Sequence, residues 1–388
     1  MIPLNYNLRN LAVRKSTTAS TALGLALVVF VFASALMLSN GLEKSLAKAG
    51  REDIAIVLRT GSETELSSSL TKSQMDLVVA SREIARSQSG EPEAIGETVI
   101  VARMERVDGS GLSNVSIRGV PDNVLHFRPE VKITAGRAPQ PGTNEVIIGG
   151  ALRGRLKGLE LGQIFELKKN RPMNVVGVFS AEGSALESEI WAGVQFIGAA
   201  FGREGSVSSV RVKLISPGKF EAFKASVSND PRLEIEVLTE PVYYEQQGAN
   251  TSIMLKSLGL IIAVLVSMGA TIGAMITMYS TISSRQREIG TLRAVGFSRA
   301  SILSAFLIES TALALVGGAI GALAALPMGF VQFSTVNFTT QSEITFKLQP
   351  SPSILITSIL FGAFMGLLGG FLPAVRAAWM QPIEALRD

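Results

Sequence analysis

The chain has 388 residues, of which 47% are hydrophobic and 18% are charged, with a formal net charge of +4. This composition is too apolar for an ordinary soluble protein of that length, and the length allows two or three structural units. Most arginines flank apolar segments, and no aromatic residues are interleaved with them, which argues against a nucleic-acid-binding protein. The absence of cysteine excludes disulfides, iron–sulfur clusters and cysteine zinc sites.

The first long apolar segment covers residues 18–39 and follows the basic residues Arg9, Arg14 and Lys15. An Ala-x-Ala sequence at 33–35 raises the alternative of a cleaved signal peptide. However, the apolar run is roughly 20 residues long and continues past that sequence, whereas the apolar core of a signal peptide is about 7–15 residues. We therefore expect an uncleaved membrane anchor.

Residues 41–250 are predicted to form a mixed α/β domain. Amphipathic helices are expected at 69–85 and 218–230, the second ending at Asp230-Pro231. Two strand–helix–strand units then flank a glycine-rich, β-rich insertion at about 120–205. The predicted strands are short strand-like runs that cover 53–59, 97–107, 114–120, 144–150, 174–179, 208–215 and 233–238.

The segment after Pro241 runs into the second apolar span without a clear helix breaker. One interpretation is a helical stalk, in which Tyr243, Tyr244, Gln246 and Gln247 face another helix or the base of the domain. A polar linker beside the membrane fits the periodicity equally well.

Three further apolar segments of spanning length cover 253–279, 302–330 and 353–372. Basic residues lie between the second and third spans and after the fourth, whereas the short loop 331–352 contains only Lys347 and Glu343 as charged residues. By the positive-inside rule, both termini and the loop 280–300 are cytoplasmic and residues 41–250 are extracytoplasmic. The arginines that carry this argument are Arg9, Arg14, Arg285, Arg287, Arg293, Arg299, Arg376 and Arg387.

These observations predict an α-helical membrane protein with four transmembrane helices and an extracytoplasmic mixed α/β domain inserted between helices 1 and 2. Residues 1–40 hold a cytoplasmic segment and the first helix, and 41–250 form the outer domain. Residues 251–388 hold helices 2–4, the cytoplasmic loop 280–300 and a cytoplasmic tail.

Residue patterns for catalysis are nearly absent. His126 is the single histidine, so no His-pair metal site can form, and we expect it to be a surface or packing residue. No G-x-x-x-x-G-K-[ST] motif is present to bind nucleotide phosphates. No apolar span contains aspartate, which excludes an intramembrane aspartyl enzyme. We predict that the chain is not an enzyme by itself and holds no metal.

One carboxylate, Glu309, lies inside the third span. A charged group in a membrane helix is a candidate functional site, because burying it there is unfavourable. The favoured alternative is a structural carboxylate near the cytoplasmic edge that fixes a helix contact or pairs with an arginine.

Glycines at four-residue spacing occur in the last three spans, and such spacing lets helix backbones approach closely in lipid. They predict tight packing, either within one chain or across a dimer. The glycines are Gly269, Gly273, Gly317, Gly321, Gly362, Gly366 and Gly370.

The segment 283–303 is predicted to extend the second span as a helix into the cytoplasm. Ile289, Leu292 and Val295 fall at helical spacing on one side, within a polar surround. Gly296 is expected to end this helix, and Ser298 to cap the next one. Such a helix can dock in a groove of a soluble partner. The alternative is that its arginines only set topology and bind lipid headgroups.

The same segment resembles a known family. REIGTLRAVGFSRASILSAFLIESTALALVGGAIGALAA at 287–325 is similar to the FtsX-type core of MacB-like ABC transporter permeases, and PAVRAAWMQPIEALRD at 373–388 resembles the closing motif of that core. NLRNLAVRKSTTASTALGLAL at 7–27 looks like the family's N-terminal entry. Residues 133–152 and 175–191 resemble its outer module, and FSAEGSALESEIW is most similar to the DevC-like branch.

The resemblance implies a homodimer in which each chain binds an ABC ATPase through a cytoplasmic coupling helix. The best match for that helix is 287–296, with Arg285, Arg287, Glu288, Ile289, Leu292, Arg293, Val295 and Gly296 as the coupling residues. No nucleotide-binding domain precedes Leu4, so we expect the ATPase to be a separate polypeptide that holds ATP and Mg²⁺, with no cofactor bound to this chain. Glu309 matches the family's FLxE, which implies a structural or coupling role.

The resemblance therefore implies the permease subunit of an ABC exporter in a bacterial inner membrane. ATP hydrolysis would move the outer domain, which engages a periplasmic adaptor or a substrate protein. Two alternatives remain open. The chain could transmit a signal that activates a cell-wall hydrolase, or it could extract lipoproteins. An intramembrane enzyme is a distant fourth hypothesis.

Overall fold

The computed structural model describes residues 15–168, 170–230 and 232–381, and for residues 15–17 it describes the backbone alone. The chain forms two compact units. The membrane unit comprises the described residues up to Asn40, Met254–Val331 and the described residues from Leu348 onward. The outer unit comprises Gly41–Ile253 and Gln332–Lys347. Arg9, Arg14, Arg387 and the end of the closing motif lie outside the described residues, as does the side chain of Lys15.

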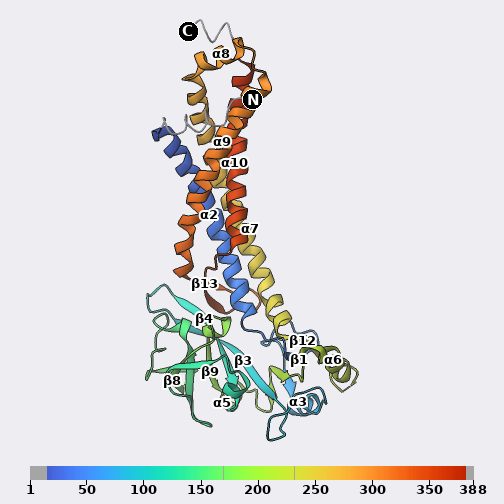
Figure 1. The fold of residues 1–388 in the computed structure, drawn as a ribbon. Coiled ribbons are helices and arrows are strands. Elements are labelled where there is room, and N and C mark those ends of the chain that lie inside the picture. The colour runs from blue at the N-terminus through green and yellow to red at the C-terminus, as the bar shows by residue number, and fades with distance from the viewer. Residues whose placement is uncertain (1–14, 169, 231, 382–388) are drawn as a thin grey trace. The chain divides into compact units, whose positions relative to one another are not determined.

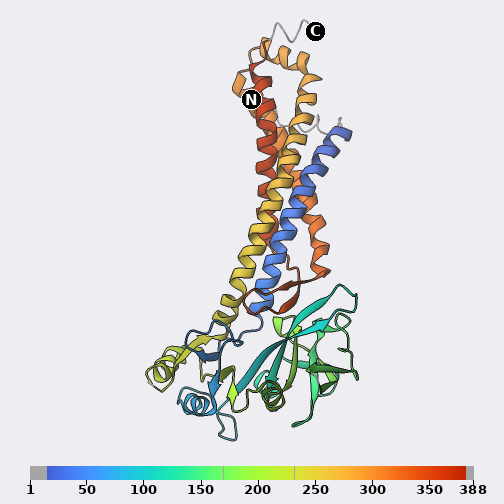
Figure 2. The ribbon, with the colours of Figure 1, turned by 180° about the vertical axis from the view of Figure 1, so that it is seen from behind.

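Among the described residues, four helices are long and apolar enough to cross a membrane. They are α2 (Lys15–Ala47), α7 (Glu240–Ser283), α9 (Arg299–Ala325) and α10 (Pro352–Trp379). The four predicted spans are therefore confirmed, and Figures 1 and 2 show the helices running side by side. A short 3₁₀ helix, η4 (Leu326–Phe330), extends α9.

Glycines bring these helices together. A Cβ atom at Gly321 would lie 2.2 Å from the backbone oxygen of Ala26, so α9 packs with its backbone against α2. On α10, a Cβ atom at Gly366 would lie 2.2 Å from the Cβ of Ala314 on α9. Such close approach is typical of helix packing in lipid, where van der Waals contact drives association.

The outer unit is built on a mixed sheet of ten strands in the order β12-β1-β11-β3-β4-β9-β6-β8-β5, with β7 paired to β8. Two pairs, β4–β9 and β6–β8, are parallel, and the other pairs are antiparallel. The strands are β1 (Ile54–Arg59), β3 (Ala94–Glu105), β4 (Leu112–Val120), β5 (Lys132–Gly136), β6 (Glu145–Gly149), β7 (Ile164–Lys168), β8 (Arg171–Ser180), β9 (Glu189–Gly193), β11 (Ser209–Lys213) and β12 (Ile235–Thr239).

Short helices and a small second sheet accompany the large sheet. The α-helices are α3 (Lys72–Val79), α4 (Val124–Phe127), α5 (Val194–Phe201) and α6 (Phe220–Ser228). The 3₁₀ helices are η1 (Gly150–Leu152), η2 (Ala185–Ser188) and η3 (Pro217–Lys219). The second sheet is formed by β2 (Leu70–Thr71), which pairs with β10 (Ser206–Val207). The helix predicted at 69–85 is wrong in its second half. It ends at Val79, and Ile84 instead forms a β-bridge with Leu214.

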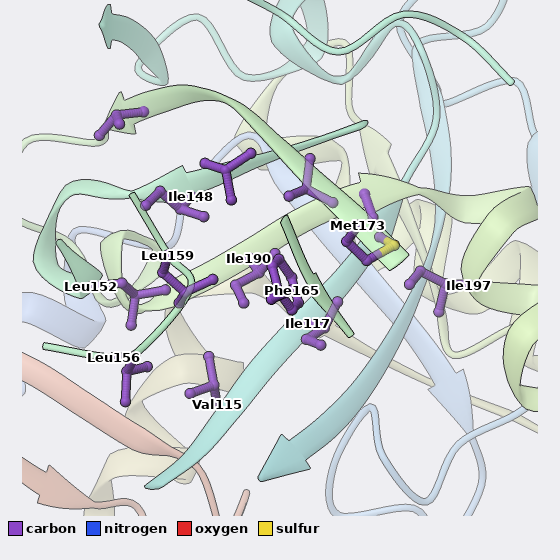
Figure 3. Packing of buried hydrophobic residues seen from close by; sticks show 14 of the residues in the cluster. Val115, Ile117, Ile148, Leu152, Leu156, Leu159, Phe165, Met173, Ile190 and Ile197 are labelled. Atoms are coloured by element: carbon purple, nitrogen blue, oxygen red, sulfur yellow. The ribbon is translucent and has the colours of Figure 1, made fainter. Parts of the chain in front are cut away.

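Two hydrophobic clusters form the core of the outer unit. One is drawn from two separate stretches of chain, and its members include Val57, Val210 and Phe223. The other lies between Ile100 and Ile197 and is shown in Figure 3. This second cluster begins two strands earlier than the predicted insertion at 120–205, because β3 and β4 contribute to it. The predicted fold class, four spans with a mixed α/β domain after the first, is confirmed.

The segment between α9 and α10 differs from its prediction as a short loop. It forms a hairpin of β13 (Gln332–Val336) and β14 (Glu343–Lys347), and this hairpin belongs to the outer unit. Asn337 shapes its turn, because its side-chain oxygen accepts the N–H groups of Thr339 and Thr340. Thus the outer unit is assembled from two stretches of chain that a whole pair of membrane spans separates.

Candidate functional site

The predicted coupling segment forms a helix of its own. α7 ends at Ser283, and α8 (Gln286–Ala294) begins after Arg285, so the expectation of one continuous helix is wrong. The predicted ending is confirmed, because Gly296 has a φ of 105° and the N–H groups of Gly296 and Phe297 bond to the carbonyls of Arg293 and Leu292. Ser298 caps α9 by accepting the N–H of Ser301, also as predicted.

The prediction that Ile289, Leu292 and Val295 form one apolar stripe is also wrong. Ile289 is 2% exposed and packs with Ile302 and Phe306 of α9, whereas Val295 is 74% exposed. The break before α8 turns the helix so that Ile289 points into the membrane unit. The exposed positions of α8 and its ending turn are Arg287, Glu288, Thr291, Ala294, Val295 and Gly296, and Leu292 and Arg293 are partly buried.

Glu309 forms a buried ion pair. Its Oε2 lies 3.2 Å from Nη1 of Arg285, and both side chains are 8% exposed. Arg285 also lies 3.0 Å from the carboxylate of Glu288 and stacks over the ring of Phe306. Of the arrangements considered from the sequence, a carboxylate paired with a neighbouring arginine is the one found. This pair joins α9 to the residue that starts α8.

The packing glycines divide into two groups. Gly317, Gly321, Gly362, Gly366 and Gly370 each have an atom of another membrane helix within 2.6 Å of where a Cβ would stand. At Gly269 and Gly273 of α7 a Cβ would meet no atom within 4 Å. Among the described residues, these two glycines therefore face open space rather than a helix of the same chain.

A network of buried charges lies in the outer unit, and sequence reasoning missed it. We call it the ionic network. Its members are Glu65, Glu97, Arg118, Arg128, Glu189, Arg211 and Glu240. Val115 and Ile117 of β4 belong to a hydrophobic cluster, so the alternation of a strand directs Arg118 to the opposite face of the sheet.

Arg118 is shared by three carboxylates. Its Nε and Nη2 each donate to Glu189 at 2.7 Å, and its Nη1 lies 3.0 Å from Glu65 and 2.8 Å from Glu97. Arg211 of β11 reaches Glu65 at 2.7 Å and also contacts Glu97. These pairs are charge-assisted, and the Arg118–Glu189 pair is bidentate, so the geometry around them is tightly defined.

Two carboxylates of this network, Glu65 and Glu97, have lowered pKa values. Burial would raise the pKa of Glu65, but Arg118 and Arg211, with hydrogen bonds from Arg211 and Ser209, hold that pKa well below its usual range. The pKa of Glu97 is lowered by the same arginines against the effect of burial.

The tyrosines beside the network come from the predicted stalk. Tyr243, Tyr244 and Gln247 are buried and Gln246 is exposed, so α7 begins as a helix that places three of these four side chains inward. The hydroxyl oxygen of Tyr243 accepts the N–H of Glu65 at 3.2 Å. The segment is therefore a helix rather than a polar linker, and of the four side chains predicted to face inward only Gln246 is exposed.

A second buried carboxylate holds the β13–β14 hairpin. Glu343 accepts hydrogen bonds from Arg106, Arg155 and Ser113. Burial would raise the pKa of Glu343, but the hydroxyl of Ser113 and the charge of Arg155 are among the contacts that lower it. A cavity of about 40 Å³ lies between this carboxylate and the ionic network.

Metal chemistry has little support in the described part of the chain. No group of three or more His, Cys, Asp or Glu side chains there is arranged to hold a metal ion. His126 is exposed in α4.

The sequence did contain a signal for the ionic network. Glu97, Arg118 and Arg211 all lie inside segments predicted as strands, and a charged residue within such a strand is buried only when paired. Their partners are far away in the chain, since Arg211 and Glu97 are 114 residues apart and Arg118 and Glu189 are 71 apart. Pairing could not be read from one sequence.

Two families match the chain. The family described as "MacB-like periplasmic core domain" matches residues 18–230, and the family described as "FtsX-like permease C-terminal" matches residues 260–382.

Individual proteins are also similar in sequence to this chain. The Bacillus subtilis protein named "Uncharacterized ABC transporter permease YknZ" is 27% identical over 290 residues, which are 71% of this chain and 70% of that protein. The macrolide export ATP-binding/permease protein MacB of Burkholderia thailandensis is 35% identical over 142 residues, which are 37% of this chain and 20% of that protein. The match therefore spans only about a fifth of this MacB protein.

Two solved structures are similar to part of the chain. The extracellular domain of YknZ from Gram-positive bacteria aligns with 48% of this chain and all of that domain, at 16% identity and a TM-score of 0.37. The periplasmic region of MacB from Actinobacillus actinomycetemcomitans aligns with 49% of this chain and 90% of that region, at 13% identity and a TM-score of 0.35.

Proposed function

The chain belongs to the FtsX-like permeases that carry a MacB-like periplasmic core domain, and on that premise we propose that it works with a separate ABC ATPase. It is an ABC transporter permease of the inner membrane. In this proposal ATP and Mg²⁺ bind to the ATPase, and ATP hydrolysis moves the outer unit. The outer unit then acts on a periplasmic adaptor or substrate protein in an export cycle.

The observation that carries the proposal is the form of α8. It is a short helix with an ending turn held by Gly296, and its inner side is anchored by Ile289 in the membrane unit. Its outer side presents Arg287, Thr291 and Val295 to solvent. A rigid exposed helix of this kind is suited to docking in the groove of a soluble partner.

A second copy of the chain is the other partner that we propose. In the most apolar stretch of α7 only 17% of the residues are buried, compared with 44% in α2. Gly269 and Gly273 lie on α7 with open space beside them. A small-residue surface on a poorly covered membrane helix supports helix–helix contact across a dimer.

The orientation follows from charge. Arg285, Arg287 and Arg299 lie at one end of the membrane helices, and the positive-inside rule assigns that end to the cytoplasm. α8 then meets a cytoplasmic ATPase, and the outer unit is extracytoplasmic. α2 and α7 each have residues in both units, which supports transmission of movement along these helices.

Purification from native membranes tests the proposal. We expect an ABC ATPase to copurify with the wild-type chain. Arg287→Glu and Val295→Asp should lose that ATPase, because they change the exposed side of α8 without touching its buried anchor. Arg82→Glu reverses a charge on an exposed residue of the outer unit and should retain the ATPase.

An active wild-type chain without any ATPase partner would refute the proposal. Full ATPase recovery with both α8 variants would instead show that the docking site has been misplaced. Mass spectrometry of the wild-type sample also identifies the outer partner, which separates an adaptor from a cell-wall hydrolase or a lipoprotein.

A further inference from the structure

Glu240 is the first residue of α7 and is fully buried in the outer unit. Its Oε1 lies 2.7 Å from Nε of Arg211 and 2.6 Å from Nη2 of Arg128. Its Oε2 accepts the backbone N–H of Arg51 at 3.1 Å. One carboxylate thus joins α7 to a central strand, to the end of α4 and to the segment that follows α2.

We infer that Glu240 is a positioning residue that fixes the first turns of α7 to the sheet, so that these turns and the outer unit move as one body. The inference rests on the proposed function, because it names the contact through which movement of a membrane helix reaches the outer unit. Neither family match assigns a role to this residue.

Buried ion pairs give this contact a property that apolar packing lacks. Apolar side chains tolerate sliding and repacking, whereas a buried carboxylate that leaves its guanidinium remains charged in a medium of low polarity. Arg211 also binds Glu65 and Glu97, which are themselves held by Arg118. Rotation or sliding of α7 would therefore disturb the whole ionic network.

Further contacts reinforce the same turns. Tyr243 receives the N–H of Glu65, and a Cβ atom at Gly248 would lie 2.4 Å from the side chain of Leu46 in α2. Ser252 donates a hydrogen bond to Glu43 of α2. Since the last turns of α2 are packed against α7 here, both helices share the anchor that Glu240 provides.

Distance measurements between two spin labels test the inference. The chain has no cysteine, so Gln195→Cys on α5 and Asn250→Cys on α7 introduce the only labelling sites, and both positions are exposed. The labelled full-length chain is reconstituted in nanodiscs with its copurified ATPase. Electron–electron resonance distances are then recorded without nucleotide and after trapping with ATP and vanadate.

With Glu240 intact we expect the distance between the two labels of one chain to have a narrow distribution that is the same in both states. With Glu240→Gln or Glu240→Ala, the distribution should broaden without nucleotide and shift after trapping. Glu245→Gln makes the same chemical change on an exposed residue of α7 and should leave the distribution narrow. Arg128→Lys keeps the charge but shortens one partner of Glu240, and it serves if the Glu240 variants do not fold.

Distributions for Glu240→Gln, Glu240→Ala and Arg128→Lys that match the wild type in both states would overturn the inference. If Glu240 only stabilised the fold, the variants would show these same unchanged distributions together with a lower melting temperature. Failure of the proposed function is recognised separately. If no ATPase copurifies with the chain, only the measurement after trapping with ATP and vanadate is lost. The comparison without nucleotide still decides whether Glu240 fixes α7.

Discussion

Replacing Arg118 by alanine removes the guanidinium that three buried carboxylates share. Arg118 is 2% exposed, and its three terminal nitrogens contact Glu65, Glu97 and Glu189. In the variant, Glu189 loses its bidentate arginine, whereas Glu65 and Glu97 keep Arg211. We predict a large loss of stability confined to the outer unit.

The size of the loss follows from the number of broken pairs. Removing one partner of a buried ion pair destabilises a protein by about 3–5 kcal/mol, and here three carboxylates are affected, so we take about 5 kcal/mol. For a unit of about 230 residues, each kcal/mol lowers the melting temperature by about 2–4 °C. The expected decrease is therefore about 10–20 °C.

The loss should also depend on pH. In the wild type the pKa values of Glu65 and Glu97 are below their usual range, so these groups add stability above the unfolded pKa and lose it as pH falls through the folded pKa. Without Arg118, burial acts against a weaker attraction and their pKa values rise. The deficit of Arg118→Ala should then be larger at pH 7.5 than at pH 3, which lies below the ordinary glutamate pKa of 4.5.

Thermal unfolding of the full-length chain in detergent, monitored by the near-ultraviolet signal of buried Trp191, measures both effects. Trp191 suits this purpose because its Nε1 donates to Glu189 of the ionic network. Arg232→Ala is the matched control, since Arg232 is exposed and paired with Asp230 outside the network. A deficit no larger than that of Arg232→Ala, or one equal at both pH values, would refute the reasoning.

Three further predictions concern the membrane unit. Gly366→Leu should lower the melting temperature in detergent, because a larger side chain overpacks the contact with α9 by about 1–3 kcal/mol, whereas Gly24→Leu, at a position with no atom within 4 Å, should not. Glu309→Gln should keep more of the ATPase complex on size-exclusion chromatography than Glu309→Ala, because glutamine can still accept a hydrogen bond from Arg285; equal recovery would contradict this. Ile289→Ala should destabilise the unit by about 2–5 kcal/mol in a denaturant titration, since Ile289 is 2% exposed.

The spans and most long strands could be predicted because their signals are local. A membrane helix is defined by the length of one apolar run, as in 18–39, and a strand such as 114–120 by alternation over a few residues. Gly296 and Ser298 were also placed correctly, because caps depend on one residue and its immediate neighbours.

The orientation of α8 could not be predicted, because it depends on a break in the chain. Periodicity placed Ile289 with Val295, on the assumption that α7 continues through Arg285. The structure ends α7 at Ser283, and α8 then turns Ile289 toward Phe306. The hairpin at 332–347 was missed for a related reason, since its strands are short and Ser188, which bonds to Thr345 of the hairpin, lies 157 residues away.

Two of the buried carboxylates that escaped prediction have similar places in the chain. Glu240 begins α7, and Glu343 begins the second strand of the hairpin that connects α9 to α10. Each lies where chain of the outer unit leads into a membrane helix, and each is bound by two arginines. Apolar residues could hold these segments at similar stability, but ion pairs also fix their orientation. A domain that has to follow its helices needs that fixed orientation most at the points where the chain passes from one unit to the other.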